Sequence, residues 1–402
     1  MSALPQPKPA PATDAIAAAI NEIGREALLR DLRDENPFAA VELIRASRFG
    51  ALRVPTAFGG GGLSIRALFA KLIDLSEADP VVTHILRTHF WFVEERLRST
   101  DEAARVRWLS AVADGTIFGN ASSERGSAAV GSLKFSTTLT PAEGGFALSG
   151  TKFYSTGALF SDWIGVWAAK NDKTLASVVV PSKLAGITLH DDWDGIGARK
   201  TGTGTTVFDN VLVRPDEVLA VIPLDEPAKP TYEFAFLQLY LQAMIAGILR
   251  SVVTDAVTLI KGRERSFSHA PVETPAEDPI LQQVVGELSA AAFAAESIVL
   301  AAADSIDAAY ASVVDGVPDS TLAQQAMQRA AEAKVHVDAI ALRASSHLFE
   351  VGSASAASRK KNLDRHWRAI RTLTLHNPTL YKAQAVGKYL INEVPFPVNA
   401  YF

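Results

Sequence analysis

The sequence predicts an α+β protein in which two helical domains flank a central β domain. Three observations support this prediction. Apolar residues recur three and four positions apart at both ends of the chain, short β-branched or alternating runs fill its middle, and a Pro-rich segment, 223–230, precedes the return of the helical pattern. With 402 residues, of which 48% are hydrophobic and 21% charged, the chain can bury a large core spread over several domains.

Four segments are expected in chain order: a disordered lead-in rich in Pro and Ala over 1–13, a helical domain over 14–115, a β domain over 116–222 and a helical bundle over 231–402. Within the first helical domain, Val54-Pro55 and the glycines at 59–62 predict a loop. Four consecutive glycines have too much backbone entropy to remain in a helix.

The β domain is expected to be an antiparallel barrel or sandwich. Its candidate strands follow one another too closely for the helical crossovers of a parallel sheet; they are Phe146–Ser149, Trp163–Ala168, Leu175–Val180 and Thr206–Val213.

The C-terminal segment is expected to form a four-helix bundle. Between Ile280 and Ala309 the apolar residues keep a spacing of three or four, which predicts a helix of about 45 Å at 1.5 Å per residue. Helices of this length are typical of bundles. Alanine at many inward positions allows close helix packing, and a second apolar face on such helices commonly contacts another subunit.

Composition excludes several classes of function. A net charge of −5 and a pI of about 5.9 disfavour nucleic-acid and membrane partners. The absence of cysteine rules out disulfides, thiolate metal sites and a cysteine nucleophile. The eight histidines form no HExxH motif, so no metal site is expected, and the pairs Gly195/Gly197 and Gly202/Gly204 lack the third glycine of a dinucleotide fingerprint. A cytoplasmic protein is expected, without a signal peptide or a spanning run of about 20 apolar residues.

Two polar turns are candidate ligand sites. Phe118–Glu124 places an amide and two hydroxyls beside a glycine, which suits the edge of a heteroaromatic ring, although a helix-capping turn would use the same residues. Gly150–Gly157 places Tyr154, Ser155 and Thr156 beside a glycine, where a flat ring could pack on the tyrosine; the alternative is an ordinary strand turn.

A third polar cluster lies near the C-terminus. Arg365, Arg368 and His376 precede or flank a turn at Pro378. They could face an anionic ligand or a reacting oxygen, or they could form a solvated helix face.

Taken in this order, the segments resemble the acyl-CoA dehydrogenase superfamily over nearly the whole chain. Val54-Pro55 with the glycine run resembles the loop of its N-terminal domain, and Gly150–Lys152 with Asp209–Val211 resembles its β domain. Five further motifs resemble its flavin-dependent monooxygenase branch, typified by dibenzothiophene monooxygenase: Asn120–Glu124, Asp191–Trp193, Arg365–Arg368, Arg371-Thr372 and His376–Pro378.

This resemblance implies a homotetramer of α–β–α subunits that uses FMN reduced by a separate NAD(P)H:flavin reductase. The reduced flavin would capture O₂ as a C4a-(hydro)peroxide and oxygenate a small apolar substrate that contains sulfur or nitrogen. The alternatives are an FAD-dependent acyl-CoA dehydrogenase, with Glu350 or Glu393 as the base, and a flavin-free scaffold that retains the fold.

The resemblance also implies roles for individual residues. The catalytic candidates are His376, Thr156 and Asn120. The cofactor-binding candidates are Asn120, Ser122, Tyr154, Ser155, Thr156, Arg263, Phe267 and Arg368, with Arg263 reaching the flavin phosphate from a neighbouring subunit. The substrate-binding candidates are Thr88, His84 and Trp193. Thr88 stands where an aromatic residue is expected, and Thr156 where the sulfur-oxidising relatives typically have serine.

Overall fold

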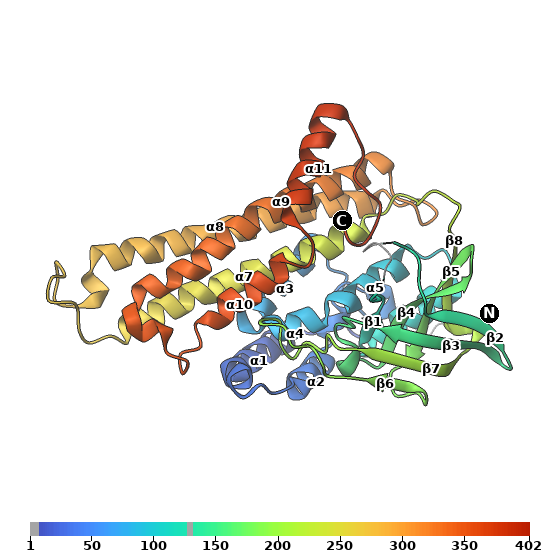
Figure 1. Cartoon of the computed structure of the whole chain (residues 1–402), viewed down its shortest axis with the longest axis horizontal. Coiled ribbons are helices and arrows are strands. Elements are labelled where there is room, and N and C mark those ends of the chain that lie inside the picture. The colour runs from blue at the N-terminus through green and yellow to red at the C-terminus, as the bar shows by residue number, and fades with distance from the viewer. Residues whose placement is uncertain (1–7, 127–131) are drawn as a thin grey trace.

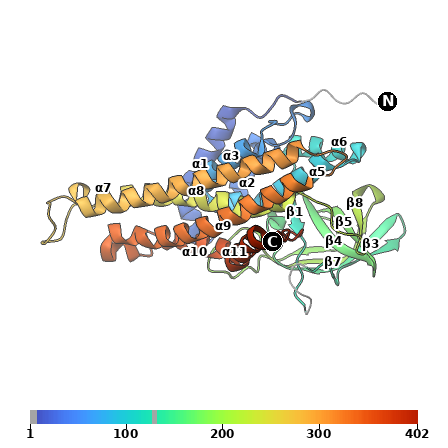
Figure 2. The same cartoon turned by 90° about the horizontal axis from the view of Figure 1, so that it is seen from above.

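The computed structural model describes residues 8–126 and 132–402, so residues 1–7 of the expected lead-in lie outside the described part. The molecule is elongated, with the β-sheet at one end and the long helices extending to the other (Figures 1 and 2). The N-terminal helices lie beside the sheet and beside the part of the long helices that is nearest to it.

Six helices form the N-terminal domain: α1 (Thr13–Arg33), α2 (Phe38–Ser47), α3 (Ile65–Ala78), α4 (Pro80–Ile85), α5 (Arg87–Arg98) and α6 (Glu102–Ala113). Short polar side chains cap three of them. Ser64, Asp79 and Asp101 accept hydrogen bonds from the first turns of α3, α4 and α6, which the free N–H groups of a helix start require. The glycine run forms the expected loop, and a Cβ at Gly60 would lie 2.1 Å from the carbonyl oxygen of Val54.

Eight strands form one sheet: β1 (Phe118–Ala121), β2 (Thr138–Ala142), β3 (Gly145–Lys152), β4 (Trp163–Asn171), β5 (Thr174–Pro181), β6 (Ile187–Leu189), β7 (Thr206–Val213) and β8 (Val218–Pro223). Their order is β6-β7-β3-β2-β4-β5-β8, with β1 beside β4. The four strands expected from the sequence are confirmed as β3, β4, β5 and β7.

The sheet is mixed and not wholly antiparallel, which corrects the sequence-based expectation. Both β1 and β2 pair with β4 in parallel, whereas the other pairs are antiparallel. The cause is the connection from β3 to β4. It crosses over the β2–β3 hairpin before β4 enters the sheet, so β4 runs in the direction of β2.

Three long helices dominate the C-terminal domain: α7 (Glu233–Lys261), α8 (Pro279–Ala311) and α9 (Ser320–His347). The 33-residue α8 confirms the predicted helix between Ile280 and Ala309. The fourth helix of the expected bundle is divided into α10 (Asp364–Thr374) and α11 (Thr379–Asn392), both of which pack against α9. Pro378 lies between them. Because proline has no backbone N–H, it cannot continue the hydrogen bonding of a helix.

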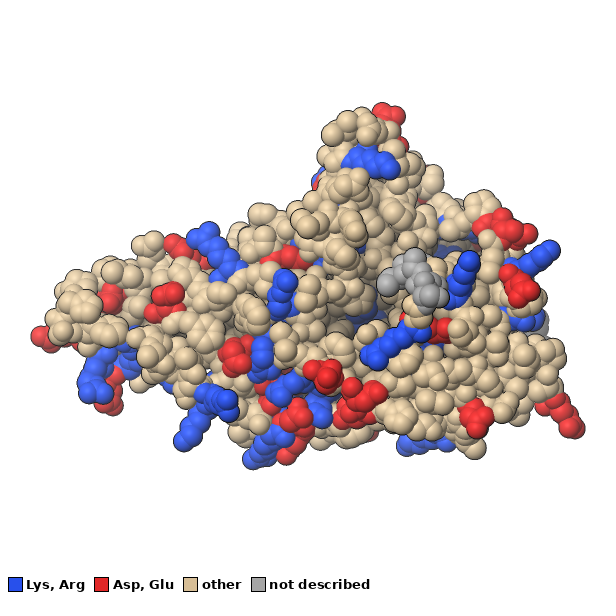
Figure 3. Space-filling view, in the orientation of Figure 1, with Lys and Arg blue, Asp and Glu red and all other residues tan. Residues whose placement is uncertain are grey.

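By length and composition, α7 and α8 could each span a bilayer. Instead they pack against each other and against α9, and α7 also packs against α3. Together these helices enclose the largest hydrophobic core of the described residues. Figure 3 shows acidic and basic side chains mixed over the surface below the bundle, whereas the projecting α11 is largely uncharged.

Candidate flavin and substrate site

The first predicted turn presents Asn120 at the edge of the sheet. Asn120 lies on β1 opposite Gly165 of β4. Its Oδ1 accepts a hydrogen bond from the hydroxyl of Ser122 at 2.7 Å, and no described residue accepts a hydrogen bond from its Nδ2. A Cβ at Gly119 would lie 2.7 Å from Cα of Ala158, so only glycine lets β1 approach the second turn this closely. The turn therefore leaves an amide donor free for a ligand.

The second turn, 153–157, has a constrained backbone. Tyr154 has a φ of 57°, in the left-handed region that residues with a side chain rarely adopt. Gly157 has a φ of 80°, and a Cβ there would lie 2.6 Å from the carbonyl oxygen of Ile85 at the end of α4. This turn is consequently pressed against the helical domain, and backbone strain of this kind is common at ligand sites.

The hydroxyl of Thr156 belongs to a short hydrogen-bonded chain. Its Oγ1 lies 2.9 Å from Oγ1 of Thr203, which lies 2.6 Å from Oγ1 of Thr201. The hydroxyl of Thr88 on α5 donates to the carbonyl oxygen of Thr156 at 3.4 Å. The predicted substrate residue Thr88 therefore contacts the predicted flavin residue Thr156.

An aromatic pair and a buried hydroxyl complete this side of the site. The rings of Tyr154 and Trp193 meet edge to face with their centroids 6.1 Å apart, and Trp193 Nε1 donates to the carbonyl oxygen of Gly197 at 3.1 Å. Ser155 is 1% exposed, and its hydroxyl has no hydrogen-bond partner among the described residues. Buried hydroxyls are normally satisfied, so this one indicates a missing ligand or water.

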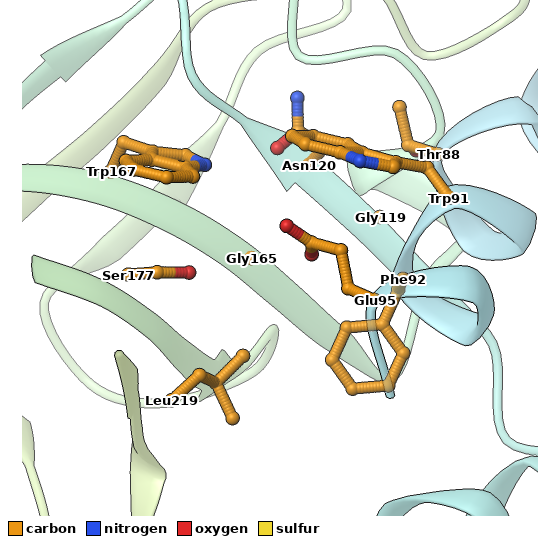
Figure 4. Close-up of a pocket in the computed structure, with 10 residues that line it drawn as sticks. All are labelled: Thr88, Trp91, Phe92, Glu95, Gly119, Asn120, Gly165, Trp167, Ser177 and Leu219. Atoms are coloured by element: carbon orange, nitrogen blue, oxygen red, sulfur yellow. The ribbon is translucent and has the colours of Figure 1, made fainter. Parts of the chain in front are cut away.

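Behind Asn120 lies a small cavity of about 20 Å³, lined also by Thr88 and Glu95. Figure 4 shows the Glu95 side chain extending into this cavity. Its size suits a single water molecule. Burial raises the pKa of Glu95 to about 7, and Arg96 and Arg98 only partly oppose this effect. A carboxyl group that is half protonated near neutral pH therefore lies next to Asn120.

His376 reaches the site from the turn between α10 and α11. The residue as a whole is exposed, and Arg87 Nη1 lies 3.2 Å from its Nε2. The guanidinium can only donate, so Nε2 accepts and the neutral ring carries its proton on Nδ1. The pKa of His376 lies well below its usual range, because burial excludes water and because Arg87, His84, Lys334 and Lys382 repel positive charge. His376 is thus a neutral N–H donor at physiological pH.

His84, at the end of α4, is the other imidazole on this side. It is 7% exposed, and its Nδ1 has no partner among the described residues. Burial lowers its pKa to about 3, with Arg87 as the second cause. His84 also lines a cavity of about 420 Å³ between α1, α7, α10 and residues 197–200, a volume in the range of small-molecule pockets.

Three predicted cofactor residues lie away from these turns within one chain. Arg263 and Phe267 belong to the α7–α8 loop, at the opposite end of the molecule from the sheet (Figures 1 and 2). Arg263 donates to the carbonyl oxygen of Val351, and Phe267 is 55% exposed. Arg368 is bound by Asp31, Asn362 and Asp364 and donates to the carbonyl oxygen of Ile196, so it supports the loop that carries Trp193.

The bases considered for a dehydrogenase do not reach the site. Glu350 lies in the short helix Leu348–Val351 beside Arg263, and Glu393 ends α11; both are exposed and neither makes a side-chain contact with His376 or Thr156.

Sequence reasoning missed several residues of the site, above all Arg87, Glu95 and Lys382. Arg87 follows His84 by three positions. In a continuous helix this spacing would predict that both side chains lie on the same helix face, but α4 ends at Ile85 and α5 begins at Arg87. The last residues of the chain contain no motif that predicts a role in the site. The hydroxyl of Tyr401 lies 2.7 Å from that of Ser123, and Gln238 donates to the carbonyl oxygen of Ala400 at 2.7 Å.

The donor set fits a flavin. An isoalloxazine ring needs an aromatic or flat surface on one face and hydrogen-bond donors along its polar edge. Tyr154 and Trp193 offer the first, and the free Asn120 amide and the unsatisfied Ser155 hydroxyl offer the second.

Comparison with known proteins shows the family to which this fold belongs. The chain matches the family models of the acyl-CoA dehydrogenase middle domain over residues 120–211 and the C-terminal domain over residues 239–379. Dibenzothiophene monooxygenase of Mycolicibacterium goodii is 30% identical over 380 residues, which cover 89% of this chain and 88% of that protein. The probable FMNH2-dependent monooxygenase SfnC of Pseudomonas putida is 27% identical, with 96% of both chains covered.

A solved structure shows the same architecture with cofactor present. FMN-bound TdsC from Paenibacillus sp. A11-2 superposes with a TM-score of 0.87 at 28% identity, covering 97% of this chain and 99% of that one. These likenesses confirm the expected fold and FMN as the cofactor. The chain therefore belongs to the acyl-CoA dehydrogenase family, in its branch of FMNH2-dependent monooxygenases.

Proposed function

We propose that this chain is the oxygenase of a two-component system and acts on a small, largely apolar substrate that contains sulfur or nitrogen. When bound, reduced FMN supplies two electrons to O₂, so that one oxygen atom enters the substrate and the other leaves as water. The observation that supports the proposal best is the close approach of β1 to the segment after the second turn, where the amide of Asn120 and the unsatisfied hydroxyl of Ser155 offer donors to a flavin ring.

On the flavin side, the protein's task is to hold the ring and keep water out. Tyr154 and Trp193 offer a ring surface, whereas Asn120, Ser122, Ser155 and Thr156 offer an amide and hydroxyls for its polar edge. These donors lie on the sheet and on a turn fixed by Gly157. Rigid placement suits them to hold a reactive oxygen without reorganisation.

On the substrate side, His376 is proposed to orient the reacting oxygen by a hydrogen bond from Nδ1. Its depressed pKa disfavours a role as a cationic acid, whereas the contact with Arg87 fixes the tautomer that can donate. Thr88 and His84 are proposed to contact the substrate. A sulfur-containing substrate is supported by the similarity to dibenzothiophene monooxygenase.

The proposed source of electrons is a separate NAD(P)H:flavin reductase, since the sequence has no dinucleotide fingerprint. The test supplies the purified chain with FMN, O₂ and an organosulfur substrate, with and without a flavin reductase and NADH. Oxygenated product should form only when the reductase is present. Steady NADH consumption by the chain alone would contradict the proposal.

We also propose a homotetramer in which each flavin site is completed by a neighbouring subunit. The α7–α8 loop, with Arg263 and Phe267, lies at the far end of the molecule from the sheet, so we propose that it serves the flavin phosphate of another subunit. Large apolar side chains are exposed on α8 and α11, among them Phe293, Leu380, Tyr381, Leu390 and Ile391. Light scattering should give about four times the chain mass of 42.9 kDa, and a monomer at micromolar concentration would contradict this assembly. A cytoplasmic location is part of the same proposal.

A further inference from the structure

The face of α5 that meets the sheet carries polar side chains. Thr88, Trp91 and Glu95 are three and four positions apart, so they lie on one side of this helix. Together with Asn120 and Ser177 of the sheet, they line the cavity of about 20 Å³ behind Asn120. Figure 4 shows the Glu95 side chain extending from α5 into the space between the helix and the strands. Of the described residues that line this cavity, Glu95 alone can carry a charge.

The carboxyl group of Glu95 receives no hydrogen bond from the described residues, although the side chain is half-buried. The two arginines nearest to it in the sequence have other partners. Arg98 donates to both carboxylate oxygens of Glu233, at 2.8 and 3.0 Å, and the guanidinium of Arg96 lies over the ring of Phe92. The carboxyl group of Glu95 is therefore left to the cavity.

Glu95 differs in this respect from comparable acids. Every other described aspartate or glutamate that is not exposed accepts at least one hydrogen bond. The most buried of them lie within 2.8 Å of a cation, in the pairs Asp79 with Arg30, Glu94 with Arg53, Glu217 with Arg214, Glu233 with Arg98 and Asp338 with Lys334. A carboxyl group without a donor in this fold needs a separate explanation.

A second unsatisfied group lines the same cavity. Trp91 is 9% exposed, and no described residue accepts a hydrogen bond from its Nε1. The cavity has room for one water molecule, which needs two to four polar partners. The indole N–H can donate to such a water, the carboxyl group of Glu95 can accept from it, and the amide of Asn120 can do either. One water thus satisfies Trp91 and Glu95 and joins them to Asn120.

The charge of Glu95 determines what lies behind Asn120. Burial raises the pKa of Glu95 to about 7; Glu233 acts in the same direction, whereas Arg96 and Arg98 oppose it. The group is therefore a neutral acid below this pH and a carboxylate above it. The described residues of the sheet that line the cavity carry no charge to compensate it. A carboxylate here opposes negative charge on the reduced flavin or on the reacting oxygen.

We propose that Glu95 is a positioning residue for the flavin side: joined to the amide of Asn120 by one water molecule, its neutral carboxyl group holds that amide toward the flavin, and its ionisation weakens both flavin binding and oxygen transfer. This inference rests on the proposed oxygenase function and adds a residue to it. Glu95 acts through Asn120 and not by contact with the reacting atoms.

Binding of oxidised FMN to the full chain, followed by flavin fluorescence, tests the positioning role without turnover. The FMN phosphate also titrates near neutral pH, so each variant is compared with wild type at the same pH. Glu95→Gln is neutral at every pH. Its FMN Kd should match that of wild type at pH 6 and be about 3- to 10-fold lower at pH 8, since a shift of one pKa unit corresponds to about tenfold in affinity. A ratio of the two Kd values that does not change with pH would overturn the proposal.

Two further variants support this comparison. Glu102→Gln, on the exposed start of α6, is the matched control for net charge and should bind FMN as wild type does at both pH values. Glu95→Leu removes the partner of the water, so it should weaken FMN binding at both pH values. Unchanged affinity in a folded Glu95→Leu would contradict the water-mediated contact. If Glu95→Leu does not fold, Glu95→Gln still decides.

Turnover of methyl phenyl sulfide, an uncharged probe, separates this inference from the proposed function. One oxygen atom goes to sulfur to give the sulfoxide and the other leaves as water, with both electrons from reduced FMN. The ratio of sulfoxide to H₂O₂ should fall several-fold in wild type from pH 6 to pH 8 and stay constant in Glu95→Gln. The same fall in both proteins would show that Glu95 is not a positioning residue and leave the oxygenase function standing. The expected FMN affinities without sulfoxide from any of these proteins would contradict the oxygenase function and leave the positioning of Asn120 standing.

Discussion

The two sides of the site differ in charge and in the elements that carry them. The flavin side is built from the sheet and its turns, where Asn120 and Thr156 present an uncharged amide and hydroxyl. The substrate side is built from α4, α5 and the α10–α11 turn, where Arg87 and two imidazoles gather without a carboxylate. The contrast separates neutral donors on the sheet, which are proposed to hold the cofactor, from a buried charge on the helices that fixes the tautomer of His376.

The largest expected effect comes from His376, the proposed hydrogen-bond donor of the substrate side. His376→Ala removes one oriented N–H donor, so oxygenated product should fall by about 10²-fold, the range for losing such a donor or a general acid. Oxygen should still react with reduced flavin, and the missing product should therefore reappear as H₂O₂. The measurement is the ratio of product to H₂O₂ with FMNH₂ supplied.

Folding and FMN binding should change little in His376→Ala, because His376 is an exposed residue. An unchanged ratio of product to H₂O₂ would remove His376 from the mechanism. It would then be a solvated residue of the α10–α11 turn, which the sequence alone left open.

Asn120→Ala should give a loss of similar size from the flavin side, about 10²-fold in product with H₂O₂ formed instead. Unlike His376→Ala, it should also weaken FMN binding, because its amide is proposed to contact the ring. Flavin fluorescence titration of the two variants checks this difference. Equal FMN affinity in both variants would contradict the assignment of Asn120 to the flavin side.

The sequence predicted more of the flavin side than of the substrate side, for a physical reason. Asn120 lies on a short strand and Thr156 follows one, and each is next to a glycine, so the local pattern marks them. The role of Arg87 arises from a contact with His376 across 289 positions, which no local pattern encodes. The same limit applies to the fold. The spacing of apolar residues predicted α8, whereas the parallel pairing of β4 results from a connection between strands that local sequence does not encode.

A smaller effect is expected behind Asn120, at Glu95. Burial raises its pKa from 4.5 to about 7, so the folded state binds an extra proton between these values, and stability falls as pH rises through them. Glu95→Gln imitates the protonated group and should stabilise the protein at pH 8 by about 1–2 kcal/mol, after allowance for solvent screening, with little change at pH 4.

Thermal unfolding of Glu95→Gln and wild type at both pH values measures this effect. The charged groups that affect the pKa of Glu95 are Glu233, Arg96 and Arg98. Glu102, on the exposed start of α6, is not one of them, so the variant Glu102→Gln serves as a control for net charge. Stabilisation of equal size at pH 4 and pH 8 would show that folding does not raise the pKa of Glu95.

The smallest effect is expected for Thr156→Ser, and its comparison with Thr156→Val separates the hydroxyl from the methyl group. Thr156→Ser keeps the oxygen that contacts Thr203, so product should fall only a few-fold through looser packing of the turn. Thr156→Val has nearly the same shape but no hydroxyl, and should lose about 10²-fold in product with H₂O₂ formed instead. The ratio of product to H₂O₂ in the two variants decides the matter. If Ser and Val behave alike, the flavin side acts at this position by shape, and the contrast between neutral donors and charged helices rests on Asn120 alone.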